Sequence, residues 1–403
     1  MEKGKFNRVI IAVFDGMGIG SLPDAKKYGD INKSCLDDVM EKENGAFIPN
    51  LLNLGLINLS DYFKKTTKVT KLTGCYSKIR MKSCFKDSWA GHWEIAGVDV
   101  QNDYSQYCDK GFSDEIIQKF EKATGLKVLG NEAILHREEA INKVLDIHKK
   151  DKKSVIVLTE KGKETIRTFC IYISKDNMSL EEQYDLCKKT TEILKNTPGI
   201  QRIGARPIEI SNDNWIVPHP DRKDFLMFDA PDNTILQKLS EKKIGVYTTG
   251  KVSAMFRGKG IKEDNYARTN DEVHSQMIKY LDEVSNGLIF GTYNDMDCMF
   301  ATAKDTKSWK KSLEDLDIKI SEITTKMKSD DLLIICADGH GADPVYTGLH
   351  TREYSPLLVY SKKIKNTKHL DNVMYLSDIA ATIADNFEIK DFNNGNSFLN
   401  QLL

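Results

Sequence analysis

Short runs of aliphatic and β-branched residues recur along the chain, and each run ends at a polar or acidic residue. A run of this length and composition is typical of a buried β-strand. The runs lie at residues 9–14, 155–158, 244–247, 288–290, 332–336 and 357–360. Strands this apolar are covered on both faces, so the chain is restricted to folds in which other elements flank a sheet.

Charged amphipathic stretches separate these runs, for example at residues 271–284 and 308–329. Both stretches lack Pro and Gly and are long enough to be the crossover helices that parallel strands require. The alternation predicts an α/β fold with a largely parallel sheet, in which ligands bind beyond the carboxyl ends of the strands. Asp15, Asp297 and Asp338 follow three of the runs, so we expect three carboxylates near one edge of the sheet.

Chain length and a change in composition predict two domains. The chain has 403 residues, 40% of them hydrophobic, which is more than one core usually holds. Within residues 104–224 Lys and Glu become denser, and helices are expected at 113–124 and 179–195. We therefore expect a metal-binding catalytic core made of residues 1–103 and 225–403, with 104–224 inserted as a smaller α+β cap domain.

The charge balance gives no reason to expect nucleic acid or a membrane as partner. The chain carries 58 basic and 59 acidic residues, a net charge of -1, so any anionic substrate must be recognised by a local cluster. Its eight cysteines include no CxxC pair, which is typical of reduced thiols. The first apolar run stops at Asp15 and is too short for a signal peptide or a bilayer span. We expect a cytoplasmic enzyme that acts on a small molecule.

Residues 86–94, which read KDSWAGHWE, concentrate acids, bases, two indoles and one hydroxyl. The Ser88 hydroxyl is a poor nucleophile unless a base or a metal activates it. From spacing alone, an ordinary loop with Ser88 as a helix N-cap also explains the segment. Asp15 has two interpretations as well, because a helix N-cap and a metal ligand use the same position after a strand. His92 fits either a contact with phosphate or a ring hydrogen-bonded inside the segment.

Further acidic and imidazole side chains gather at 294–297, which reads NDMD, and at 337–343, which reads ADGHGAD and is followed by His350. Mixed Asp and His donors suit manganese, zinc or similar divalent metals. Two such ions would activate a nucleophile and neutralise a transferring phosphoryl group. Asp295 and Asp343 also fit the plainer role of residues that solvate loops.

Two specific strings, GHWE at 91–94 and HTREY at 350–354, match a known family. Supporting matches are FDGMGIG at 14–20, PDA at 23–25, KDS at 86–88, ARP at 205–207, GKVS at 250–253 and DMD at 295–297. On these residues the chain resembles the phosphopentomutases of the alkaline-phosphatase superfamily, essentially from end to end. The resemblance implies an alkaline-phosphatase-like core with two divalent ions, usually manganese, and a smaller inserted cap.

The resemblance also implies an activity, the interconversion of ribose or deoxyribose 1-phosphate and 5-phosphate. Ser88 stands where the family has a phosphorylated Thr, and its phosphoryl group would pass to the sugar phosphate. The resulting sugar bisphosphate, which also serves as activator, would return the other phosphoryl group. Arg206, Arg222 and Lys251 match the family's contacts with substrate phosphate, a role that suits guanidinium forks.

The same matching assigns metal ligands. Asp15 and Asp338 are expected to hold the metal beside Ser88, and Asp297 and His350 are expected to hold the second.

The chain departs from the family pattern in its metal ligands and in its cap. Thr302 stands where the family has a His five residues after the Asp that matches Asp297, and a hydroxyl is a poorer ligand than imidazole. The family's Asp-His-Gly reads Asp-Gly-His-Gly at 338–341, so His340 reaches the metal only if the loop bulges. In the cap, residues 158–164 lack the family's Ser/Thr-x-Asp-Ser segment, so the resemblance does not identify the sugar.

These departures keep three functions under consideration. The first is a phosphopentomutase with a remodelled metal site. The second is a phosphatase, or a mutase for another phosphate ester, because a loosened cap would admit water. The third is a non-catalytic descendant that binds a sugar phosphate or a partner, with a degraded second metal site.

Overall fold

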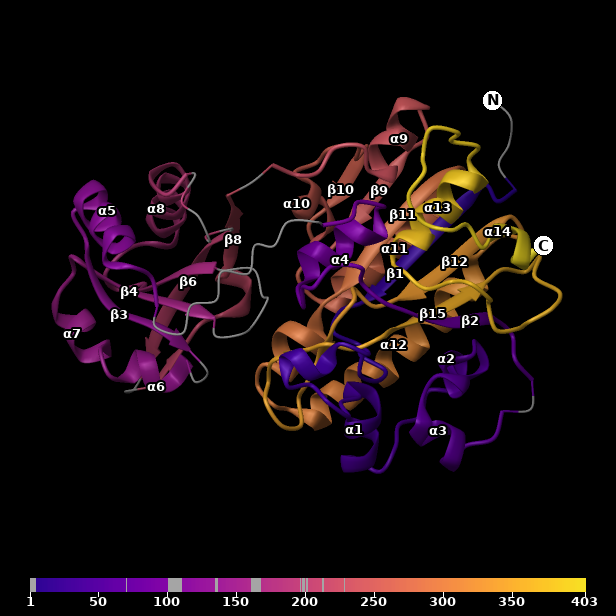
Figure 1. Cartoon of the computed structure of the whole chain (residues 1–403), viewed down its shortest axis with the longest axis horizontal. Coiled ribbons are helices and arrows are strands. Elements are labelled where there is room, and N and C mark those ends of the chain that lie inside the picture. The colour runs from indigo at the N-terminus through magenta and orange to yellow at the C-terminus, as the bar shows by residue number, and fades with distance from the viewer. Residues whose placement is uncertain are drawn as a thin grey trace. The chain divides into compact units, whose positions relative to one another are not determined.

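The computed structural model describes residues 5–69, 71–100, 111–134, 137–160, 168–195, 197, 200, 202–211, 214–227 and 229–403. By its contacts the chain divides into two compact units (Figure 1). The larger unit is made of Met1–Gln101 and Ala230–Leu403, and the smaller unit, Asn102–Asp229, is inserted between these two segments. The sequence placed the insertion at 104–224.

A seven-stranded sheet forms the centre of the larger unit, in the order β10-β9-β11-β1-β12-β15-β2. Its strands are β1 (Arg8–Phe14), β2 (Cys75–Ile79), β9 (Val246–Thr249), β10 (Glu263–Asn265), β11 (Gly287–Tyr293), β12 (Asp331–Cys336) and β15 (Ser355–Tyr360). Strand β1 is parallel to both β11 and β12, and β9 and β10 continue this parallel part. Strand β15 is antiparallel to β12 and to β2.

Helices cover both faces of this sheet. On one face Ile10, Ala12 and Phe14 of β1 join a core with side chains of α11 (Asn270–Glu283) and α12 (Thr306–Lys326). On the opposite face the His92 ring of α4 (Ser88–Ile95) stacks on Phe290 of β11. The other helices of this unit are α1 (Cys35–Lys42), α2 (Pro49–Asn53), α3 (Asp61–Thr66), α9 (Ile235–Glu241), α10 (Val252–Phe256), α13 (Ser377–Asn386) and α14 (Leu399–Leu402).

Short elements carry several of the site residues. A π-helix, η4 (Met296–Ala301), follows β11, and the strands β13 (Gly341–Ala342) and β14 (His350–Thr351) pair antiparallel after β12. The remaining short helices of the larger unit are η1 (Ala25–Tyr28) and η2 (Leu56–Asn58).

The smaller unit has its own sheet, in the order β3-β4-β5-β6-β7, with β8 paired to β6. Its elements are β3 (Lys127–Ile134), β4 (Ser154–Glu160), β5 (Thr168–Ser174), β6 (Arg202–Ser211), β7 (Asn214–Ile216), β8 (Lys223–Leu226), η3 (His219–Asp221), α5 (Asp114–Thr124), α6 (Arg137–Asn142), α7 (Leu145–Lys150) and α8 (Leu180–Ile193). Successive residues of β4 enter two separate hydrophobic cores, one on each face of the sheet.

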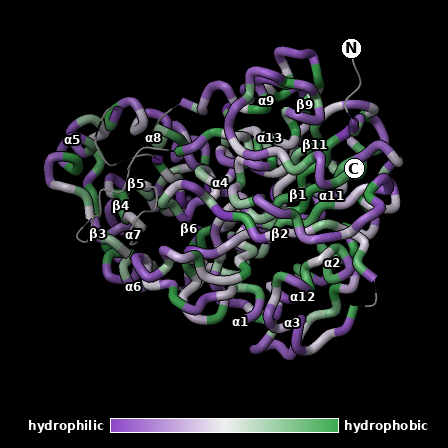
Figure 2. The backbone as a smooth tube through the Cα atoms, turned by 45° about the vertical axis from the view of Figure 1, so that its right-hand side comes forward, coloured by the Kyte–Doolittle hydropathy of each residue, from purple (hydrophilic) through white to green (hydrophobic). Residues whose placement is uncertain are grey.

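The strands and helices expected from the sequence are present, and the α/β class is confirmed. The apolar composition of the buried strands is visible along the green parts of the backbone tube in Figure 2. The run at 155–158 lies in β4 of the smaller unit. All cysteines in the described residues are free thiols, and Cys108 lies outside that part of the chain. No helix among the described residues is both long and apolar enough to cross a membrane.

Candidate active site

Three carboxylates and one serine hydroxyl lie beyond the carboxyl edge of the parallel strands. Asp15 directly follows β1, Asp338 follows the neighbouring strand β12, and Asp297 lies in η4 after β11. Ser88 is the first residue of α4. Because the carboxyl ends of adjacent parallel strands meet at one edge, residues far apart in sequence come together there.

The Ser88 hydroxyl lies at the centre of this group and is 7% exposed. Its Oγ is 2.5 Å from Asp338 Oδ2 and 3.0 Å from Asp15 Oδ1. His340 Nε2 lies 3.3 Å and Lys251 Nζ 2.8 Å from the same oxygen. A hydroxyl with carboxylates to accept its proton and an ammonium to donate to its oxygen is a candidate nucleophile.

Helix α4 fixes the position of Ser88. Asp87 is the N-cap, and its carboxylate accepts a hydrogen bond from the Trp89 N–H at 2.8 Å. The interpretation of Ser88 as an N-cap is therefore wrong, since Ser88 lies inside the helix. A Cβ at Gly91 would come 1.7 Å from the carbonyl oxygen of Asp338. Only glycine lets α4 pack this closely on the segment after β12, which explains the first residue of the GHWE string.

A bulge accommodates the extra residue after Asp338. Gly339 has a φ of +90°, and a Cβ there would come 2.1 Å from Met81 Cγ. Glycine adopts this left-handed conformation without steric penalty. The bulge brings His340 Nε2 to 3.5 Å from Asp338 Oδ2 and 3.8 Å from Asp15 Oδ1.

Asp15, Asp338 and His340 form a compact group of potential metal ligands. All three are buried, and one ligand atom from each lies within 4.8 Å of the others. Two carboxylates and one imidazole, with the Ser88 oxygen beside them, fit a divalent ion such as manganese or zinc.

Asp297 and His350 form an adjoining pair. His350 Nε2 lies 3.2 Å from Asp297 Oδ1, and its Nδ1 donates to the Lys86 carbonyl at 2.7 Å. The rings of His340 and His350 stack with centroids 4.0 Å apart. Thr302 is exposed, and its hydroxyl donates to the Asp297 carbonyl oxygen at 3.3 Å. The two halves of the site thus touch through stacked imidazoles, but they differ in their donors.

The buried charges shift one another's pKa values. Burial, followed by the like charge of Asp338, raises the pKa of Asp15 well above its ordinary value. Burial opposes ionisation of Asp338, but His340 and Lys251 hold the pKa of that carboxyl well below its usual range. Asp15 is therefore the carboxyl that gains most from a bound cation.

The Asp297–His350 pair is held as an ion pair. Burial opposes both charges, but His350 lowers the pKa of Asp297 to about 2. Asp297 in turn raises the pKa of His350 to about 10. A metal at this pair must therefore displace a firmly held proton.

Comparison with known proteins shows similarity along the whole chain. The chain is 35% identical over 410 residues to a phosphopentomutase of Alkaliphilus oremlandii, which covers 98% of this chain and 99% of the relative. It is 37% identical over 408 residues to a phosphopentomutase of Caldanaerobacter subterraneus, with 98% of each chain covered. The chain belongs to the phosphopentomutase family. It is a phosphopentomutase-like isomerase.

Two broader matches agree with this family. Residues 232–391 match the model of the Metalloenzyme superfamily. A solved structure of Leishmania mexicana phosphoglycerate mutase covers 97% of each chain with a TM-score of 0.51 at 12% identity, which bears on the fold alone. The alkaline-phosphatase-like α/β class expected from the sequence is therefore confirmed.

Lys251, which the resemblance assigned to the substrate phosphate, lies at Ser88 in the structure. It is the N-cap residue of α10, and its ammonium contacts Asp15 and donates to Ser88 Oγ. Burial opposes its charge, but Asp15 and Asp338 raise the pKa of Lys251 above its ordinary value. The ammonium is thus a fixed positive charge beside the hydroxyl.

The other two residues that match the family's substrate contacts lie in the smaller unit. Arg206 of β6 donates to Asp224 Oδ1 at 2.7 Å, and Arg202 lies 3.2 Å from Asp224 Oδ2. Burial opposes the Asp224 charge, but Arg206, Arg202 and Arg222 lower the pKa of that carboxyl. Residues 158–164 were compared above with the family's sugar-contact segment. Of these, 161–164 lie outside the described residues.

The structure shows His92 hydrogen-bonded on both ring nitrogens. Nδ1 donates to the Ser88 carbonyl at 2.7 Å, so Nε2 accepts from the Thr292 hydroxyl at 2.8 Å. Burial lowers the pKa of His92 to about 4. The neutral ring therefore ties the first turn of α4 to β11.

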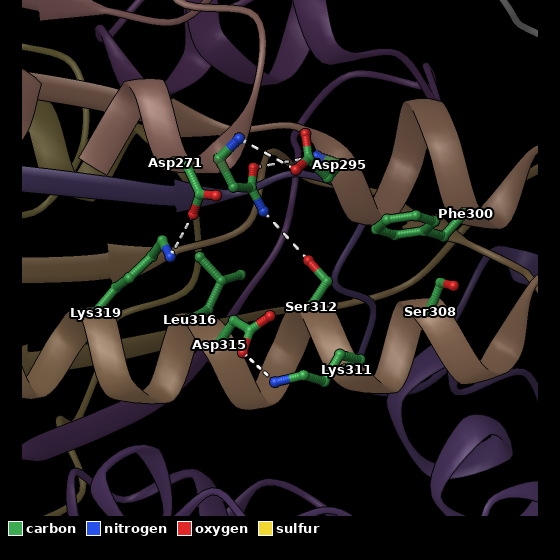
Figure 3. A pocket seen from close by; sticks show the side chains of 10 residues that line it. Asp271, Asp295, Phe300, Ser308, Lys311, Ser312, Asp315, Leu316 and Lys319 are labelled. Atoms are coloured by element: carbon green, nitrogen blue, oxygen red, sulfur yellow. Dashed lines mark hydrogen bonds and ion pairs between the residues drawn. The ribbon is translucent and has the colours of Figure 1, made fainter. Parts of the chain in front are cut away.

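Asp295 and Asp343 support backbone structure. Asp295 Oδ2 accepts from the Asn270 N–H at the start of α11, at 3.1 Å. Figure 3 shows Asp295 at a pocket between α11, α12 and η4, whose walls include the Asp271–Lys319 ion pair. Asp343 accepts hydrogen bonds from the N–H groups of the loop that follows it. Loop support explains both acids.

Sequence reasoning gave no individual role to two residues that brace the site. Glu353 accepts hydrogen bonds from the Gly20 N–H, the Cys35 N–H and the Cys35 thiol. Arg352 pairs with Asp24 at 3.0 Å. Both residues lie in the HTREY string, so they fix β14, which carries His350, to the loop after β1.

Proposed function

We propose that this phosphopentomutase-family enzyme interconverts ribose or deoxyribose 1-phosphate and 5-phosphate through a phosphorylated Ser88. The observation that carries the proposal is the position of the buried Ser88 Oγ within 3.3 Å of Asp15, Asp338, His340 and Lys251. This environment combines proton acceptors, a fixed ammonium and potential metal ligands around one hydroxyl.

The chain's own residues divide the work. Asp338, whose Oδ2 lies 2.5 Å from Ser88 Oγ, accepts the Ser88 proton when the hydroxyl attacks phosphorus. Lys251 donates to the same oxygen and stabilises it when a phosphoryl group leaves. In the transfer to substrate, the sugar hydroxyl loses its proton as its oxygen bonds to phosphorus, the bond between Ser88 Oγ and phosphorus breaks, and the Ser88 oxygen takes back a proton. The resulting sugar bisphosphate returns its other phosphoryl group to Ser88.

The proposed cofactor is Mn²⁺. Asp15, Asp338 and His340, with Ser88, would hold it, whereas Asp297 and His350 offer only two donors to a second ion. When bound, a divalent ion neutralises charge on the transferring phosphoryl group and on the nucleophile.

The proposed substrate contacts are Arg206 and Arg222 of the smaller unit, because guanidinium groups bind phosphate through paired hydrogen bonds. Burial and pairing with Asp224 hold Arg206 in place before substrate arrives.

The test is conversion of ribose 5-phosphate to ribose 1-phosphate with Mn²⁺ and a catalytic amount of sugar bisphosphate. We expect the isomer to accumulate to equilibrium without release of inorganic phosphate. Phosphate release that depends on Ser88 would identify a phosphatase instead. Binding of the sugar phosphate without turnover under any divalent metal would identify a non-catalytic descendant.

A further inference from the structure

The two halves of the metal site differ in the number of protein donors. Asp15, Asp338 and His340 supply three ligand atoms within 4.8 Å of one another. Asp297 and His350 supply two, 3.2 Å apart. Across the described residues, no further His, Cys, Asp or Glu side chain completes a group of three with Asp297 and His350.

Thr302 stands where the resemblance places a third ligand. Its N–H bonds the Asp297 carbonyl at 3.4 Å, five residues back, as a π-helical turn does. This places residue 302 on the same side of η4 as Asp297. The Thr302 hydroxyl, however, donates to that carbonyl at 3.3 Å, and the side chain is exposed. A short, neutral hydroxyl in this position does not replace an imidazole.

Two neighbours of Asp297 that carry potential ligand atoms, Cys298 and Asp295, make other hydrogen bonds. The Cys298 thiol donates to the Asn294 carbonyl at 3.1 Å. Asp295 accepts from the Asn270 N–H at the start of α11 and lines the pocket drawn in Figure 3. Neither side chain completes the pair formed by Asp297 and His350.

The Lys251 ammonium adds a positive charge beside the nucleophile. Lys251 contacts Asp15 and donates to Ser88 Oγ at 2.8 Å. It therefore reaches both the nucleophile and Asp15.

We propose that this chain is a one-metal variant of its family, in which a single divalent ion binds tightly at Asp15, Asp338 and His340. The Lys251 ammonium supplies the second positive charge at Ser88, and the Asp297–His350 pair does not retain a metal. The inference rests on the metal-dependent function proposed above. The inference concerns the number of metal ions bound per chain, which is measured without turnover. A wrong ion count is therefore distinguishable from a failure of the proposed function.

The first test counts manganese. Metal-free enzyme is loaded with Mn²⁺, passed through a desalting column and analysed for manganese per chain. We expect about one equivalent in the unmodified chain and about two in Thr302→His, because the added imidazole completes a set of three donors. Met299→His, on an exposed position of the same π-helix, is the matched control and should retain about one.

Two equivalents in the unmodified chain would overturn the proposal, and so would one equivalent in a folded Thr302→His. A second pair of variants avoids dependence on the folding of Thr302→His. Asp338→Asn should lose the retained manganese, whereas Asp297→Asn should keep it. Loss in both variants would contradict a single site on the Asp338 side.

The second test addresses Lys251 through coupling. Lys251→Met removes the charge and keeps the length of the side chain. We expect it to lower kcat by about 100-fold in the unmodified chain, and by about 10-fold or less in manganese-loaded Thr302→His, because the second ion then supplies the charge. Equal losses in the two backgrounds would contradict the substitution of ammonium for metal.

Discussion

The Lys251 ammonium donates to the Ser88 hydroxyl oxygen at 2.8 Å, although the two residues are 163 positions apart in sequence. This donation directs the single proton of the hydroxyl away from Lys251, toward Asp338 Oδ2 at 2.5 Å. The contact thus polarises Ser88 in the direction that a nucleophile requires.

Removing the hydroxyl should abolish phosphoryl transfer. We expect Ser88→Ala to lower kcat by at least about 10⁴-fold, because no side chain remains to carry the phosphoryl group. Ser88→Thr should keep substantial activity, since it retains the hydroxyl. Ser275→Ala, on the exposed side of α11, is the control and should match the unmodified enzyme. Transfer of labelled phosphate to protein measures the intermediate directly.

Removing a ligand from the buried group should weaken metal binding. We expect Asp338→Asn and His340→Gln each to raise the Kd for Mn²⁺ by at least about 100-fold, measured by titration calorimetry. Asp343→Asn should bind manganese normally, because Asp343 supports its own loop. Chelation of the unmodified enzyme should abolish activity, and added Mn²⁺ should restore it. Activity that survives thorough chelation would argue against a metal-dependent reaction.

The contact between α4 and the segment after β12 should not tolerate a methyl group. In Gly91→Ala the new Cβ would lie 1.7 Å from the Asp338 carbonyl oxygen, so α4 must move and displace Ser88. We expect a loss of about 3 kcal/mol or more in the free energy of unfolding, together with a fall in activity.

Gly258→Ala is the matched control for this substitution. Gly258 has a φ of +73° and open space around its Cβ position. The change there should cost only about 1 kcal/mol, from left-handed strain. Equal destabilisation by the two substitutions would show that the contact with Asp338 is unimportant.

The buried His92 should make stability depend on pH. Its pKa is lowered from the ordinary value of 6.5 to about 4 in the folded protein. The unfolded chain therefore binds a proton first as pH falls, and the free energy of unfolding decreases between pH 6.5 and about 4. The full effect is about 3 kcal/mol.

Urea unfolding across this pH range measures the effect. His92→Gln keeps a donor and an acceptor but does not titrate, so its stability should depend less steeply on pH. Parallel pH profiles for the two proteins would contradict the assignment of a neutral His92.

Recognition of the substrate phosphate should depend on the guanidinium group of Arg206. Arg206→Lys should raise the KM for ribose 5-phosphate by about 10-fold with little change in stability, because an ammonium does not form paired hydrogen bonds. Arg202→Lys is the matched control for Arg206→Lys, since Arg202 also pairs with Asp224 but lies outside the ARP string. It should change KM by less than about twofold. Equal effects would show that both arginines act only through Asp224.

The sequence by itself determined the class of fold and the candidates for the site. Apolar runs long enough to be strands and amphipathic stretches long enough to be crossover helices are local properties, so they are legible without a structure. Asp15, Asp297 and Asp338 follow strands, and parallel strands bring their carboxyl ends to one edge. Their convergence could therefore be predicted. The strings GHWE and HTREY supplied the family.

Only the tertiary structure decided how these residues share the chemistry. Whether His340 reaches Asp338 depended on the left-handed conformation of Gly339, and the direction of Thr302 depended on the π-helical turn. The placement of Lys251 at Ser88 required α10 and α4 to be positioned by the same sheet. These outcomes depend on distances of a few ångströms between segments remote in sequence. Such distances are set by packing, which no local pattern of residues records.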